Sequence, residues 1–68
     1  MITTITTDEA AKRLREVGMS TSPTTLRDGI EQRRFPFGDC VVSSAGTRTF
    51  YVYARLLDEW IKERSDGN

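Results

Sequence analysis

Residues 18–27 have the sequence GMSTSPTTLR, which contains the end of one helix and the start of another. Gly18 is suited to stop a helix in a left-handed C-terminal turn, because glycine has no Cβ to clash there. Ser22-Pro23 is a typical helix start: the serine caps the helix, and the proline takes the first helical position, where its missing N–H costs nothing. Two helices joined by residues 18–21 alone have the spacing of a helix-turn-helix.

The helix before this turn is predicted from a capping pattern and an apolar face. Residues 6–9, TTDE, form a capping box, in which a threonine oxygen accepts an amide N–H and Glu9 reaches back to the cap amide. The apolar residues that follow fall on one helical face, namely Ala10, Ala11, Leu14 and Val17.

The helix after the turn has a narrower apolar stripe, which consists of Leu26 and Ile30. Gly29 weakens this helix a little, because glycine is a poor helix former. We expect the helix to end near Arg33 or Arg34, since Phe35 precedes a proline and is biased out of the helical region.

The pattern changes after Gly38. Residues 40–43 and 47–53 are rich in branched and aromatic side chains, and residues 44–46 between them have turn character. Phe50 and Val52 alternate with more polar neighbours, which predicts a β-hairpin with one buried face. The two rings of the preceding string FPFG, residues 35–38, are expected to anchor the start of this hairpin beneath the helices.

A third helix is predicted over residues 54–64. Its buried stripe would consist of Leu56, Leu57, Trp60 and Ile61. Residues 65–68, SDGN, are expected to be a frayed tail. The order helix, turn, helix, hairpin, helix is that of a small α+β winged helix-turn-helix, in which the second helix enters a DNA groove and the hairpin, called the wing, touches the adjacent backbone.

The composition bounds both fold and chemistry. The 68 residues give room for one domain, residues 1–68, and the single cysteine, Cys40, excludes an internal disulfide and fits a reducing compartment. The chain has no histidine and no phosphate-binding glycine loop, so we expect no catalytic residue, no metal site and no cofactor. No apolar run is long enough to span a bilayer and no leader segment is present, so we expect a cytoplasmic protein without a membrane partner.

Net charge alone does not indicate nucleic-acid binding, because ten basic residues cancel ten acidic ones. The charges are mildly segregated: residues 22–55 contain five arginines and three acids, an excess of two positive charges.

The second helix carries the main candidates for DNA contact. Short hydroxyls and an arginine in its first turns are side chains that reach base edges and phosphates in the major groove. The alternative is structural: Thr24 and Thr25 belong to a capped first turn, and Arg27 pairs with Glu31. Arg33-Arg34 either complement the negative end of the helix dipole or hold a phosphate, and both interpretations stay open.

The hairpin carries a smaller set of candidates. Arg48 lies just past the tip among small polar residues, where a wing needs a cation for the backbone or the minor groove. The alternative is an ordinary polar turn. The candidate DNA-binding residues are, in full, Ser22, Thr24, Thr25, Arg27, Asp28, Arg33, Arg34, Thr47 and Arg48.

Three short motifs resemble those of MerR-like regulators and excisionase-type DNA-binding proteins. Residues 22–27, SPTTLR, resemble the start of that group's recognition helix, where a Ser-x-x-Thr-Leu-Arg pattern is typical. Residues 7–11, TDEAA, and 57–61, LDEWI, resemble its opening and closing helices. The string FPFG, the hairpin and the last helix are also similar to small phage or prophage DNA-binding proteins and to the DNA-binding head of phage terminase small subunits. The resemblance implies that Thr25 and Arg27 face DNA and that Arg48 is a wing contact.

The chain also departs from MerR-like regulators. They usually carry an aromatic residue after Leu-Arg, where this chain has Asp28 and Gly29, and no long dimerising helix follows before Asn68. We therefore expect an excisionase-like recombination directionality factor or a small phage regulator, with duplex DNA, a recombinase or further copies of itself as partners. The alternatives are a protein-interaction adaptor that kept the fold, and the DNA-recognition module of a packaging protein.

Overall fold

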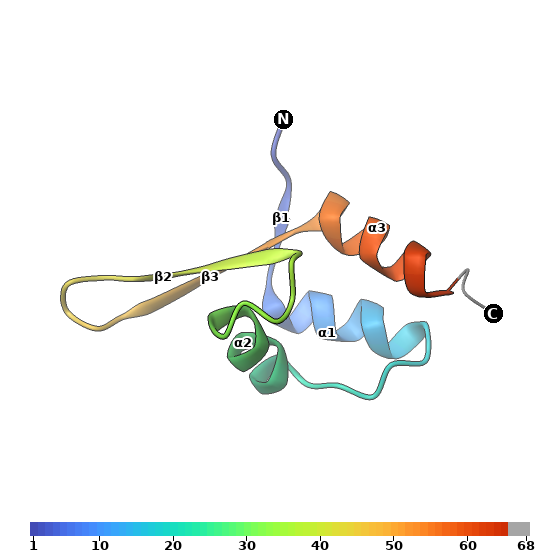
Figure 1. The fold of residues 1–68 in the computed structure, drawn as a ribbon, viewed down its shortest axis with the longest axis horizontal. Helices are drawn as coiled ribbons and strands as arrows, with labels where there is room; N and C mark the ends of the chain where they lie inside the picture. The colour runs from blue at the N-terminus through green and yellow to red at the C-terminus, as the bar shows by residue number, and fades with distance from the viewer. Residues whose placement is uncertain (66–68) are drawn as a thin grey trace.

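The described residues, 1–65 of a computed structural model, form three helices and one three-stranded antiparallel sheet (Figure 1). In chain order the elements are β1 (Thr4–Ile5), α1 (Thr7–Glu16), α2 (Pro23–Glu31), β2 (Gly38–Val42), β3 (Arg48–Tyr53) and α3 (Ala54–Ser65). The expected α+β class and the order of helices and hairpin are therefore confirmed. The β2–β3 hairpin, here called the arm, projects away from the helices (Figure 1).

Both ends of α1 follow from residues close in sequence. The Thr6 hydroxyl accepts the Glu9 amide N–H at 3.0 Å, as the capping pattern predicts. The other half of the expected capping box is wrong, because the Glu9 carboxylate accepts a hydrogen bond from Arg13 Nε at 3.2 Å instead. Gly18 has φ +100° and ends the helix in the expected left-handed turn. Val17 was expected on the buried face but is 55% exposed, because it is already the C-cap residue and has left the helical path.

Helix α2 starts as expected at Ser22-Pro23 and ends earlier than expected, at Glu31. The chain then reverses through Arg33, whose φ is +60°, and the Arg34 N–H donates to the Gly29 carbonyl at 2.8 Å. This turn brings the Phe35 ring back over Gly29, where an added Cβ would collide with the ring. Gly29 is therefore a packing requirement as well as a weak point in helix propensity.

The sheet has the strand order β1-β3-β2. The hairpin register pairs Cys40 with Phe50, and the inward alternation of Phe50 and Val52 is confirmed. The short strand β1 was not expected: Ile5 pairs with Val52 on the other edge of β3. Two residues are too few to show a strand pattern, so only the adjacent β3 edge makes them a strand.

The core lies between the helices and the inner face of the sheet. Its buried side chains are Ala10, Ala11, Leu14, Leu26, Ile30, Phe37, Val52 and Leu57. The Phe35 and Phe37 rings stack with centroids 5.2 Å apart, and Trp60 meets Phe37 edge-on at 5.3 Å, so the two rings anchor the arm as expected. Leu56 is 43% exposed rather than buried, because it lies on the outer side of α3 beside the inward Leu57. Of the expected tail, Ser65 belongs to α3, and residues 66–68 lie outside the described residues.

Candidate nucleic-acid interface

The first turn of α2 brings together two candidate hydroxyls in a helix cap. The Ser22 Oγ accepts the Thr25 amide N–H at 3.2 Å and lies 3.0 Å from the Thr25 Oγ1. These two side chains therefore have the structural role that their position in a capped turn predicts. Thr24 and Thr25 are nevertheless exposed, so both also face solvent at the start of the helix.

Arg27 connects α2 to α1. It is half-buried, and its Nη1 donates to Thr7 Oγ1 at 3.1 Å while its Nη2 donates to Thr24 Oγ1 at 3.4 Å. The predicted ion pair between Arg27 and Glu31 is wrong, because Glu31 pairs with Arg48 instead. A guanidinium has five N–H donors, so these two hydrogen bonds hold Arg27 in place and leave donors free.

The last residue of α2 contacts the arm. Glu31 Oε2 lies 3.2 Å from Arg48 Nε, and the two side chains are 36% and 57% exposed. An ion pair this exposed is screened by salt and contributes only about 0.2–1 kcal/mol. Its importance is geometric, since it holds the wing candidate Arg48 beside the helix that carries the other candidates.

The remaining candidates are exposed. Within residues 1–65, the side chains of Asp28, Arg33 and Arg34 make no ion pair or hydrogen bond. Thr47 directly precedes β3 at the hairpin turn, where its N–H donates to the Ser43 Oγ at 3.1 Å. The structure thus brings Arg48 of the arm to the end of α2, while the Thr47 N–H is bonded within the hairpin turn.

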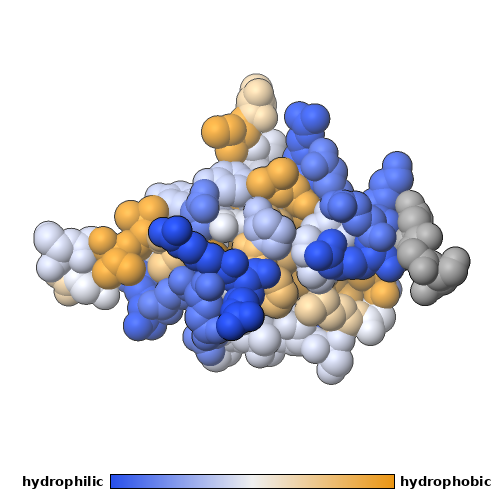
Figure 2. Space-filling model, in the orientation of Figure 1, coloured by the Kyte–Doolittle hydropathy of each residue, from blue (hydrophilic) through white to orange (hydrophobic). Residues whose placement is uncertain are grey.

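The charge of this surface is weakly positive. Four arginines stand against two acids, a net of +2, and these residues are Arg27, Arg33, Arg34, Arg48, Asp28 and Glu31. Figure 2 shows hydrophilic atoms gathered over α2 and the turn that follows it, with a hydrophobic patch beside them on the arm. On β2, Val41 and Val42 are 54% and 55% exposed.

A hollow of about 570 Å³ separates the end of α2 from the arm. Glu31 and Arg33 line it from the helix end, and Asp39, Cys40 and Val42 line it from β2. Glu31 beside Arg33 makes the hollow mixed in charge rather than a continuous basic groove.

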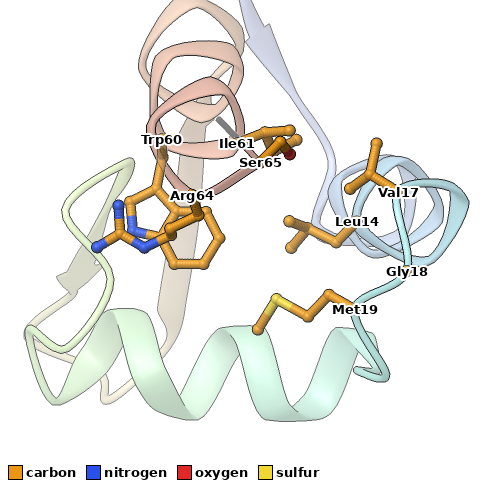
Figure 3. Close-up of a pocket in the computed structure, with 8 residues that line it drawn as sticks. All are labelled: Leu14, Val17, Gly18, Met19, Trp60, Ile61, Arg64 and Ser65. Atoms are coloured by element: carbon orange, nitrogen blue, oxygen red, sulfur yellow. The ribbon is translucent and has the colours of Figure 1, made fainter. Parts of the chain in front are cut away.

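A second hollow, of about 460 Å³, lies at the other end of the molecule, between the ends of α1 and α3 (Figure 3). Its lining includes five apolar side chains, Leu14, Val17, Met19, Trp60 and Ile61, beside the polar Arg64 and Ser65. The Arg64 guanidinium stacks over the Trp60 ring at 4.1 Å.

Tertiary contacts add two residues to the site that the sequence did not single out. Thr7 accepts a hydrogen bond from Arg27, twenty positions along the chain, and no local sequence pattern predicts that contact. For Glu31 the only local signal in the sequence is its i,i+4 spacing from Arg27, which predicts a different partner from the one that it has.

On the outer face of the sheet, the hydrogen bond that the Tyr53 hydroxyl donates to Asp39 at 2.8 Å raises the pKa of the phenol.

The part of the chain that the structure describes contains no group of three or more His, Cys, Asp or Glu side chains that could hold a metal ion. None of its helices is long and apolar enough to cross a membrane. Comparison with family models, curated proteins and solved structures gives no match, so the function of this surface has to be argued from its own geometry.

Proposed function

We propose that this chain is a non-enzymatic winged helix-turn-helix protein that binds duplex DNA, with α2 as the recognition helix and the arm as the wing. The observation that supports this best is the Glu31–Arg48 contact, because it joins the recognition helix and the wing into one surface. Exposed Thr24, Thr25 and Asp28 would face base edges in the major groove, and Arg27 and Arg48 would contact phosphates.

In this proposal Arg27 acts through its hydrogen bonds as well as its charge. Pinned by Thr7 and Thr24, it would offer its remaining N–H groups to a phosphate without losing side-chain freedom on binding. A single module buries roughly 600–1,000 Å² on DNA, so neighbouring copies or a recombinase would supply additional affinity in an excisionase-like or regulatory role in the cytoplasm.

The test is a fluorescence-anisotropy titration with mixed duplex DNA between about 50 and 200 mM salt, with Arg27→Ala and Arg48→Ala beside the unchanged protein. The log of affinity should fall with log salt by about 0.9 per phosphate contacted, and both variants should flatten this slope. Arg55→Ala is the matched control, since Arg55 is a 90%-exposed arginine on α3 that pairs with Glu59. Binding indifferent to Arg27 and Arg48, or no binding at low salt, would refute the proposal.

A protein-interaction adaptor is the second candidate, and the five apolar side chains that line the hollow between α1 and α3 favour it. The solvent side of α2 argues the other way. Its exposed residues are Thr24, Thr25, Asp28 and Glu31, all of them polar, whereas an adaptor using this helix would need apolar side chains there.

A further inference from the structure

Arg33 occupies a backbone conformation that arginine rarely adopts. Its φ is +60°, and it follows the C-cap Gln32 of α2, the position where a helix usually ends in glycine. The Arg33 N–H donates to the Ile30 carbonyl at 3.0 Å and the Arg34 N–H to the Gly29 carbonyl at 2.8 Å. Both bonds are made by the backbone, so glycine at position 33 would keep them without the steric cost of a Cβ.

Stability does not account for the arginine side chain. A cation near a helix C-terminus is favourable, but Arg34 already supplies one there without a positive φ. The Arg33 guanidinium also has no hydrogen bond or ion pair within the described residues. A strained residue whose side chain does nothing for the fold points to a role outside the fold.

The position of Arg33 indicates what that role is. Arg33 lines the hollow between the end of α2 and β2, together with Glu31, whose carboxylate holds the wing residue Arg48. If α2 enters a major groove and the arm follows the neighbouring backbone, a DNA strand has to pass between these two elements.

We propose that Arg33 binds a phosphodiester of that strand, and that the chain keeps a strained helix end in order to place this arginine between recognition helix and wing. The inference rests on the proposed DNA binding and adds the residue that contacts the backbone at the crossing. The sequence leaves open whether Arg33 complements the helix dipole or holds a phosphate, and the structure favours the phosphate contact.

The test measures stability and binding on the same variants. Arg33→Gly should raise Tm by about 4 °C, because relief of the positive φ outweighs the entropy that glycine adds to the unfolded chain. It should also flatten the salt slope of DNA binding by about 0.9. Arg33→Gln keeps the strained Cβ, so it should flatten the slope equally without raising Tm. Arg34→Gly should not raise Tm, since no positive φ is relieved and glycine loosens the unfolded chain. Arg55→Gln should leave the slope unchanged.

The outcomes separate this inference from the proposed function. If the unchanged protein binds DNA with a steep salt slope and both Arg33 variants bind identically, Arg33 is not a phosphate contact and the inference fails alone. If Arg33→Gly does not raise Tm, the helix end is not strained and the inference also fails. If the unchanged protein does not bind DNA at low salt, the proposed function fails and the inference with it.

Discussion

Replacing Gly29 by alanine tests the packing at the end of α2, because helix propensity and packing predict opposite effects of this substitution on stability. Helix propensity alone predicts that Gly29→Ala stabilises the protein by about 0.5–1 kcal/mol. The structure predicts the reverse, since the new Cβ would collide with the Phe35 ring, which is stacked on Phe37 with centroids 5.2 Å apart and lies edge-on to Trp60 at 6.0 Å.

Overpacking of this kind costs about 1–3 kcal/mol, so after the propensity gain we expect a net destabilisation of roughly 1 kcal/mol. In a domain of this size that lowers Tm by about 4–8 °C, which circular dichroism during heating and urea unfolding both detect. Asp28→Ala, at an exposed neighbouring position of α2, is the control and should not destabilise.

A second variant identifies the cause. In a Phe35→Leu background the ring is gone, so Gly29→Ala should change sign and stabilise by the propensity term. A rise in Tm for Gly29→Ala in the unchanged protein would show that the ring moves aside freely. The account of why α2 ends where it does would then be wrong.

Three further predictions concern the core, the arm and the outer face of the sheet. Trp60→Ala removes the ring that Phe35 and Phe37 pack against and should cost about 3 kcal/mol, most of the stability of a chain this small; unfolding at an unchanged urea midpoint would contradict it. Glu31→Gln should cost less than about 1 kcal/mol at low salt and almost nothing at 1 M salt, because the pair with Arg48 is exposed; an equal loss at both salt concentrations would point to buried packing instead. The Tyr53 phenol should titrate above its ordinary pKa of 10.0 by ultraviolet absorbance, and Asp39→Asn should lower that value. Because the folded state holds this proton more tightly, its contribution to stability is present below pH 10.0 and is lost as the pH rises through the raised pKa; a titration unchanged by Asp39→Asn would exclude the hydrogen bond as the cause.

The helix starts and the first helix stop could be predicted because their determinants lie within one turn of the chain. Thr6 caps an amide three residues ahead, Ser22 does the same, and Gly18 adopts its left-handed conformation through its own lack of a Cβ. The alternation of Phe50 and Val52 is equally local, since successive side chains on a strand point to opposite faces. These local preferences therefore do not depend on how the rest of the chain folds.

The candidate site was predicted less completely, because a side chain's partner depends on which segment the fold brings to it. The i,i+4 spacing on α2 predicts that Arg27 pairs with Glu31. In the folded chain Arg27 instead donates to Thr7, and Glu31 pairs with Arg48. Val17 and Leu56 fit an apolar stripe by spacing but are exposed, because Val17 is already the C-cap residue of α1 and Leu56 lies on the outer side of α3.

The sequence alone therefore determined the order of elements, their caps and most of the core, all of which depend on neighbours a few residues apart. Tertiary structure decided that β1 is a strand, that Gly29 leaves room for a ring, and that α2 ends early, at Glu31, before the left-handed Arg33. Each of these depends on the path of the chain after a turn. That path is chosen by the packing of the whole core rather than by the preferences of the residues in the turn.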